Sequence, residues 1–139
     1  MSLKNMEFDL GKLFEKKIEI IAAYLYGSFL YAENPNDIDI GLLIKENFQP
    51  DHLYEIKLAR ELEKMLKTRY NNFKPIDVRI LNHKSLRFLF SIFNNSKVIY
   101  SKNDLERCNF EDKIIKQYFD IKPHYDFYDK MRYVRYANE

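Results

Sequence analysis

Two apolar segments joined by a short polar loop constrain the fold of this chain most strongly. Residues 18–26 are almost entirely apolar, as expected for a central strand that is covered on both faces. Residues 36–44 are predicted to form the next strand, and they carry Asp37 and Asp39. Side chains two positions apart on a strand point to the same face. Both carboxylates are therefore expected together, where their mutual repulsion requires a positive counter-charge such as a divalent metal ion.

The pair Gly27-Ser28 directly follows the first strand, and a helix is predicted to begin at Ser28. The free N–H groups at a helix start, together with the Ser28 hydroxyl, form a receptor for phosphate oxygens. Gly27 allows phosphate to approach the backbone closely. Gly41, on the carboxylate face of the second strand, is also predicted to leave room for a ligand. Taken alone, a Gly-Ser pair after a strand is an ordinary turn.

Asp77 is predicted to supply a third carboxylate from a neighbouring strand over residues 74–81, in which apolar residues alternate with polar ones. Mg²⁺ prefers oxygen ligands and often completes its shell with substrate phosphate. The three aspartates thus predict one or two magnesium ions that clamp the oxygens of a phosphoryl displacement. Asp77 is the expected acceptor for the proton of the attacking hydroxyl. Arg79, on the same face, is either a phosphate contact or an ion-pair partner.

The remaining periodicities complete one α/β (α+β) domain around a mixed sheet of about four strands flanked by helices, with a C-terminal helical tail. The whole chain, residues 1–139, is predicted to be one domain, with a core over about 18–101 and a helical segment over about 103–139. Pro123 is predicted to kink that segment or to begin a new helix. The other predicted elements are a helix over 6–17, a helix that begins with Asp51 as its N-cap, a helix over 85–94, and a strand over 97–100.

Composition excludes several classes of function. A net charge of +2 is far from the dense positive field of a nucleic-acid-binding surface, so no direct nucleic-acid binding is expected. The single cysteine, Cys108, excludes an internal disulfide and argues against a cysteine-based zinc site, which suits a reducing cytoplasm. The three histidines show no ligand spacing. No apolar stretch is long enough to span a bilayer, so no membrane association is expected.

The combination of Gly27-Ser28, Asp37-x-Asp39 and Asp77 within Pro-Ile-Asp-Val resembles the signature of the polymerase-β-type nucleotidyltransferase superfamily. The short chain points to its minimal nucleotidyltransferase (MNT) branch. The similarity covers nearly the whole chain and resembles the antitoxin members that pair with HEPN-domain toxin ribonucleases. It implies the polymerase-β-like nucleotidyltransferase fold.

Two departures from the family pattern concern the phosphate-binding turn. The loop between Ser28 and Asp37 has eight residues, which is shorter than is usual in the family. It also carries Phe29 to Ala32 where the family usually has arginine and glycine. Both departures bear on the affinity for a triphosphate.

By this resemblance, Gly27 and Ser28 would bind ATP, and Asp37, Asp39 and Asp77 would be catalytic carboxylates that bind magnesium. The activity implied is transfer of AMP from ATP to a tyrosine hydroxyl of a partner HEPN-type toxin, within a hetero-oligomer. Two alternatives stay open. One is a non-catalytic antitoxin that neutralises its partner by binding, and the other is a nucleotidyltransferase that acts on a small molecule such as an aminoglycoside.

The C-terminal segment is rich in amphipathic aromatic and basic side chains. Such a stripe either packs over the sheet as core or forms a protein interface. We expect both, with the end of the segment at an interface. The residues concerned are Tyr118, Tyr125, Tyr128, Lys130, Arg132, Tyr133, Arg135 and Tyr136.

Overall fold

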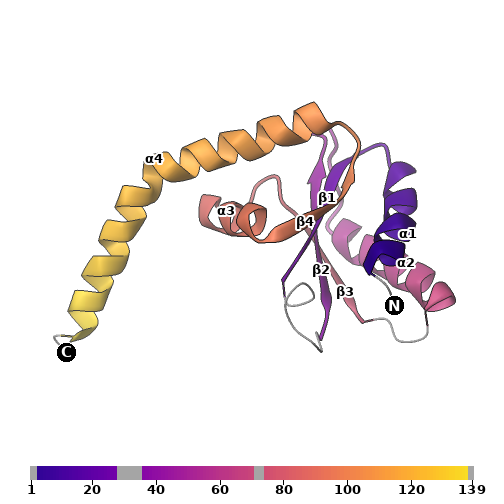
Figure 1. Ribbon diagram of the computed structural model, residues 1–139, viewed down its shortest axis with the longest axis horizontal. Helices are drawn as coiled ribbons and strands as arrows, with labels where there is room; N and C mark the ends of the chain where they lie inside the picture. Colours follow the sequence, from indigo (N-terminus) through magenta and orange to yellow (C-terminus); the bar gives the residue numbers. More distant parts are fainter. Residues whose placement is uncertain (1–2, 28–35, 71–73, 138–139) are drawn as a thin grey trace.

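The computed structural model describes residues 3–27, 36–70 and 74–137. Helices and strands follow one another along these ranges (Figure 1). In chain order they are α1 (Leu3–Glu15), β1 (Ile20–Tyr26), β2 (Ile38–Ile44), α2 (Tyr54–Arg69), β3 (Ile76–Ile80), α3 (Leu86–Asn94), β4 (Ser96–Ser101) and α4 (Asp104–Ala137). Every element predicted within these ranges is present, with ends that differ by a few residues.

The strands form one mixed sheet in the order β3-β2-β1-β4. β1 is antiparallel to both of its neighbours, β2 and β4, whereas β3 runs parallel to β2. The parallel pair is joined through α2, because parallel strands need a long crossover connection. The predicted α/β (α+β) class with a mixed four-stranded sheet is therefore confirmed.

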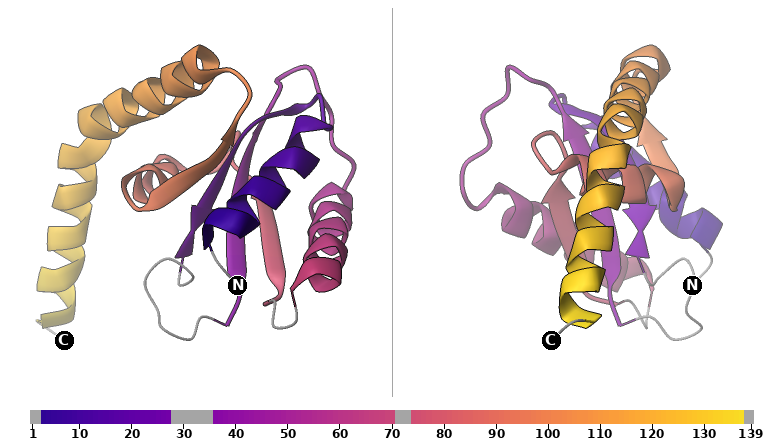
Figure 2. Two further views of the ribbon diagram at one scale, coloured as in Figure 1. Left: turned by 45° about the vertical axis from the view of Figure 1, so that its right-hand side comes forward. Right: turned by 90° about the vertical axis from the view of Figure 1, so that its left-hand side faces the viewer.

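One face of the sheet is covered by α1 and α2 (Figures 1 and 2). Alternate residues of β2, including Ile38, Ile40 and Leu42, are fully buried there. Since strand side chains alternate between the faces, this burial directs Asp39 to the opposite face. The helix residues that complete this core include Met6, Leu10, Phe14, Leu58, Leu62 and Leu66.

The other face is covered in part by α3 and the first half of α4 (Figure 1). Tyr24 of β1 is buried there, and its hydroxyl donates to Oε1 of Glu111 on α4 at 2.6 Å. Arg107 Nη1 donates to the same oxygen at 2.8 Å. These bonds fasten α4 to the central strand, which is buried on both faces as predicted.

Helix α4 is a single helix of 34 residues that contains Pro123. The ribbon bends about midway along it, where orange gives way to yellow (Figure 1), as expected where proline removes a backbone donor. Before the bend, Tyr118 stacks on Phe90 of α3 with ring centroids 3.9 Å apart. From residue 126 to 135 every side chain is exposed. No helix in the described ranges could span a bilayer.

Strand β3 lies at an edge of the sheet, and two glutamates of α2 cap its outward N–H groups. The N–H of Ile76 donates to Glu63 Oε1 at 3.0 Å, and that of Ile80 donates to Glu55 Oε2 at 2.8 Å. Exposed edge strands invite pairing with another chain. Glu55 lies on the same side of α2 as its buried apolar residues, and its hydrogen bond to the N–H of Ile80 explains why an acidic residue stands there.

The prediction that Asp51 is the N-cap of α2 is wrong. The N-cap is Leu53, which makes no side-chain capping hydrogen bond. Asp51 Oδ1 instead accepts the N–H of Leu53 at 2.8 Å, and its carbonyl accepts the N–H of Tyr54 at 3.2 Å. The carboxylate therefore closes a local turn ahead of the helix, a common alternative use of an aspartate side chain.

Candidate active site

Asp39 and Asp77 lie opposite each other on neighbouring parallel strands. The register of β2 and β3 pairs them directly. Their neighbours Ile38, Ile76 and Val78 are buried beneath α1 and α2, so both carboxylates project from the other face. The structure thus brings together two of the three aspartates that the sequence singles out.

Asp37 lies just before β2, rather than within it as predicted, because the strand begins at Ile38. It is half-buried and lies two residues before Asp39 along the chain. Its charge contributes to a raised pKa of the Asp39 carboxyl, which places the two groups within electrostatic range. The third aspartate therefore belongs to the same cluster of negative charge.

Gly27, at the end of β1, is held against the Asp39 carboxylate. Its φ is +80°, a left-handed conformation that favours glycine. A Cβ added there would lie 2.2 Å from Asp39 Oδ2, well inside van der Waals contact. The backbone angle therefore favours glycine here, and any side chain would have to displace the Asp39 carboxylate. Ser28, the other residue predicted to bind phosphate, lies outside the described residues.

Gly41 does not leave room for a ligand as predicted. A Cβ at this position would lie 2.8 Å from Cδ1 of Leu81, because that side chain packs directly over the glycine. Leu81 is fully buried in the second core. The absent side chain is thus required by packing between β2 and the residue that follows β3.

Asp39 occupies an electrostatically unfavourable position. Burial is the main cause of its raised pKa, followed by repulsion from Asp37 and Asp77. Arg79 acts in the opposite direction and favours the ionised form. A carboxylate destabilised in this way gains most from a cation that binds beside it.

Tyr26 is a site residue that the sequence analysis did not assign. It pairs with Asp39 across β1 and β2, and burial, with Asp39 next, raises the pKa of its phenol to about 12. Its ring meets that of Phe88 edge-on, with centroids 6.2 Å apart. Both rings line a pocket of about 280 Å³ that also includes Gly27. The available signal was the alternation along β1, which places Tyr26 on the same face as Tyr24.

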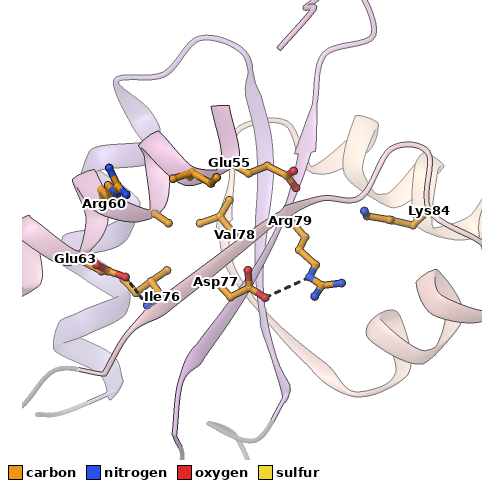
Figure 3. A pocket seen from close by; sticks show the side chains of 10 residues that line it. Glu55, Arg60, Glu63, Ile76, Asp77, Val78, Arg79 and Lys84 are labelled. Atoms are coloured by element: carbon orange, nitrogen blue, oxygen red, sulfur yellow. Dashed lines mark hydrogen bonds and ion pairs between the residues drawn. The ribbon is translucent and has the colours of Figure 1, made fainter. Parts of the chain in front are cut away.

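Arg79 is the ion-pair partner of Asp77. Its Nε donates to Asp77 Oδ2 at 3.2 Å, and both side chains are about half exposed. Figure 3 shows the two side chains pointing toward each other on β3, with Lys84 farther along the same pocket. This pocket, of about 420 Å³, lies between β3 and α2.

The carboxylates suit a magnesium ion that is shared with a substrate. Among the described residues, no three or more His, Cys, Asp or Glu side chains gather as a metal cage. Mg²⁺ usually binds through one or two carboxylates and completes its shell with phosphate oxygens and water. Asp37 and Asp39 fit that pattern, because Asp37 adds to the raised pKa of the Asp39 carboxyl and a cation beside them would favour its ionised form. Asp77 is held by its ion pair with Arg79.

The sequence matches a family model described as "Polymerase beta, Nucleotidyltransferase" over residues 9–105. This range contains all the aspartates of the site and β1 to β4. None of the curated proteins compared with the sequence matches it.

Three solved structures share the fold over nearly the whole chain. One is the complex of tri-AMPylated HEPN toxin with MNT antitoxin from Shewanella oneidensis, with a TM-score of 0.69 and 21% identity over 93% of this chain and 98% of that one. A toxin–antitoxin complex with AMP-PNP has a TM-score of 0.69 and 22% identity over 91% and 98%. The MntA–HepT toxin–antitoxin complex has a TM-score of 0.68 and 20% identity over 93% and 98%. At these identities the comparison establishes a common fold.

Proposed function

The chain belongs to the polymerase beta nucleotidyltransferase family, and from this premise we propose that it transfers AMP from ATP to a hydroxyl group of a protein partner. The observation that carries the proposal is the convergence of Asp39 and Asp77 beside Gly27, whose positive φ favours glycine and whose Cα is held against the Asp39 carboxylate. Acidic residues that merely face solvent on a strand do not need a glycine held against one of their carboxylates. The matching folds of complexes with an ATP analogue and with an AMPylated toxin support the same chemistry.

In the proposed reaction, the acceptor oxygen forms a bond to the α-phosphorus of ATP as the bond from that phosphorus to pyrophosphate breaks. Asp37 and Asp39 would hold magnesium, which would supply charge neutralisation for the phosphate oxygens. Asp77 accepts the proton of the acceptor hydroxyl through the oxygen that Arg79 does not contact. Gly27 and Ser28 bind the triphosphate, with Gly27 allowing the phosphates to approach the backbone.

The proposed acceptor is a tyrosine of a HEPN-type toxin ribonuclease, for which this chain acts as the antitoxin. Support comes from the structures with matching folds, which are HEPN toxin–MNT antitoxin complexes, one of them with a tri-AMPylated toxin. In this proposal the partner protein presents its hydroxyl to the face of the sheet that carries Asp39 and Asp77.

The end of α4 is the proposed docking element for this partner. Between residues 126 and 135 it exposes Phe127, Met131 and Val134, at 61%, 51% and 42%. Their spacing of four and then three residues places them on one side of the helix. In Figures 1 and 2 this part of α4 extends away from the sheet and toward the end of the molecule where β1 ends. Apolar side chains left exposed on one side of a helix are suited to packing against a partner.

A ribonuclease assay separates this function from neutralisation by binding. Toxin is incubated with the chain, ATP and Mg²⁺, is then purified away from the chain, and its RNA cleavage is measured. We expect toxin treated with the wild-type chain to stay inactive, because the modification is covalent. Toxin treated with Asp39→Asn should regain full activity. If toxin treated with the wild-type chain also regains activity, neutralisation is by occlusion alone.

Deletion of the residues after Asp129 tests the docking element separately. We expect affinity for the toxin to fall, while ATP binding is unchanged because the carboxylate site stays intact. Lys64→Gln, on the exposed surface of α2, is a suitable control for a general change of surface charge. Unchanged toxin affinity in the truncated chain would show that the partner docks elsewhere.

A further inference from the structure

Arg79 is the cation that the fold places beside the carboxylates. It follows Asp77 by two positions on β3 and pairs in register with Gly41 of β2. Its side chain is 51% exposed, lines the pocket beside β3, and points away from α2 toward the side on which Lys84 lies (Figure 3). A guanidinium in this position is accessible to a ligand that approaches the aspartates from solvent.

The hydrogen bonding of Arg79 leaves much of its donor capacity unused. It contacts Asp77 through Nε, and within the described ranges no hydrogen bond engages its two terminal amino groups. Two terminal amino groups in one plane match two oxygens of a phosphate. The nearby acids compete weakly, because Glu55 and Glu63 already accept N–H groups of β3. The free side of the guanidinium is thus suited to a phosphate group.

The sequence also explains why a basic residue is needed at this strand. The segment that joins Gly27 to Asp37 contains no lysine or arginine. Asp39 and Asp77 on one face, with Asp37 two residues before Asp39, repel a triphosphate, and metal ions neutralise only part of the combined charge. Positive charge from another element is therefore required for tight binding, and Arg79 already acts electrostatically on Asp39.

We propose that Arg79 binds the β- and γ-phosphates of the nucleotide and stabilises pyrophosphate as it leaves, with Asp77 holding the guanidinium in place before ATP arrives. This inference rests on the proposed nucleotidyl transfer. It assigns to β3 the positive charge that the phosphate-binding turn lacks. Arg79 is then both the partner that restrains Asp77 and a direct contact to substrate.

Nucleotide binding by the Arg79→Gln variant tests this assignment. Titration calorimetry with Mg²⁺ measures affinity for AMP-PNP, which has three phosphates, and for AMP, which lacks the β- and γ-phosphates. Arg79→Gln should bind AMP-PNP about ten- to a hundredfold more weakly, because a hydrogen bond to a charged group is lost. Its affinity for AMP should be unchanged. Arg79→Lys keeps the charge without the paired donors and should recover part of the loss.

Arg60→Gln is the matched control, because Arg60 lines the same pocket and contacts no aspartate of the site in the described structure. This variant should bind AMP-PNP with the affinity of the wild type. If both variants lose the same affinity for AMP-PNP, the loss comes from the total positive charge of the pocket, and a specific phosphate contact by Arg79 is refuted. An unchanged affinity in Arg79→Gln would also overturn the proposal. If the wild type itself binds no AMP-PNP, the proposed nucleotidyl transfer fails as well. A thermal unfolding curve establishes that each variant is folded.

Discussion

Replacement of Gly27 by alanine should damage both stability and catalysis. At a φ of +80°, a residue other than glycine costs about 1–2 kcal/mol. The new Cβ would also lie 2.2 Å from Asp39 Oδ2, whereas ordinary contact begins at 3.4 Å, so the two groups must separate by about 1 Å. We therefore expect Gly27→Ala to lower the free energy of unfolding by at least about 1–2 kcal/mol.

The effect on activity follows from the displaced carboxylate. A shift of about 1 Å in a positioned catalytic group can reduce a rate by about a hundredfold. AMP transfer by Gly27→Ala should fall to that extent at saturating ATP, at a temperature where the variant is fully folded. Thermal unfolding followed by circular dichroism should show a midpoint lower by roughly 3–8 °C.

Gly11→Ala provides the control for this substitution. Gly11 lies within α1, and a Cβ there would be 3.8 Å from the carbonyl oxygen of Ile99, an ordinary contact. Alanine is favoured over glycine in a helix by about 1 kcal/mol, so this variant should be more stable and fully active. Wild-type stability and wild-type transfer in Gly27→Ala would refute the contact between Gly27 and Asp39 on which the site is built.

Two further substitutions test the electrostatics and the sheet edge. Asp39→Asn should raise the thermal midpoint of the metal-free protein near pH 7, because folding raises the pKa of Asp39 and so disfavours its charged form. That gain should disappear as the pH falls through the raised pKa, where the wild-type carboxyl is also neutral; a gain that persists at low pH would point to another cause. Glu63→Ala should lower the free energy of unfolding in urea by about 1–2 kcal/mol, because the N–H of Ile76 loses its acceptor. Glu63→Gln, which keeps an acceptor, should lose less, and equal losses would argue against the hydrogen bond.

Local pattern predicted much of this fold. Alternation of apolar and polar residues around Ile38 and Ile76 identified the two strands. It also identified the face that carries Asp39 and Asp77, because successive side chains of a strand point to opposite faces. Ser85 was placed at the start of a helix and is the N-cap of α3, where its side chain accepts the N–H of Phe88. These features depend on residues close in sequence.

The features that were missed depend on residues distant in sequence. Gly41 suggested space for a ligand, yet Leu81, forty residues later, fills it. The role of Glu55 required knowledge that β3 is an edge strand beside α2. Tyr26 lies beside Asp39 only because β1 pairs with β2 in this register. Such contacts follow from strand order and register, which no single segment encodes.

The mass of the toxin measures the central claim most directly. The chain is incubated with ATP, Mg²⁺ and the HEPN-type toxin, and the intact mass of the toxin is determined, with Asp39→Asn in parallel. We predict a gain of one or more AMP units on the toxin with the wild-type chain and none with the variant. A toxin that is inhibited while its mass stays unchanged would contradict the account.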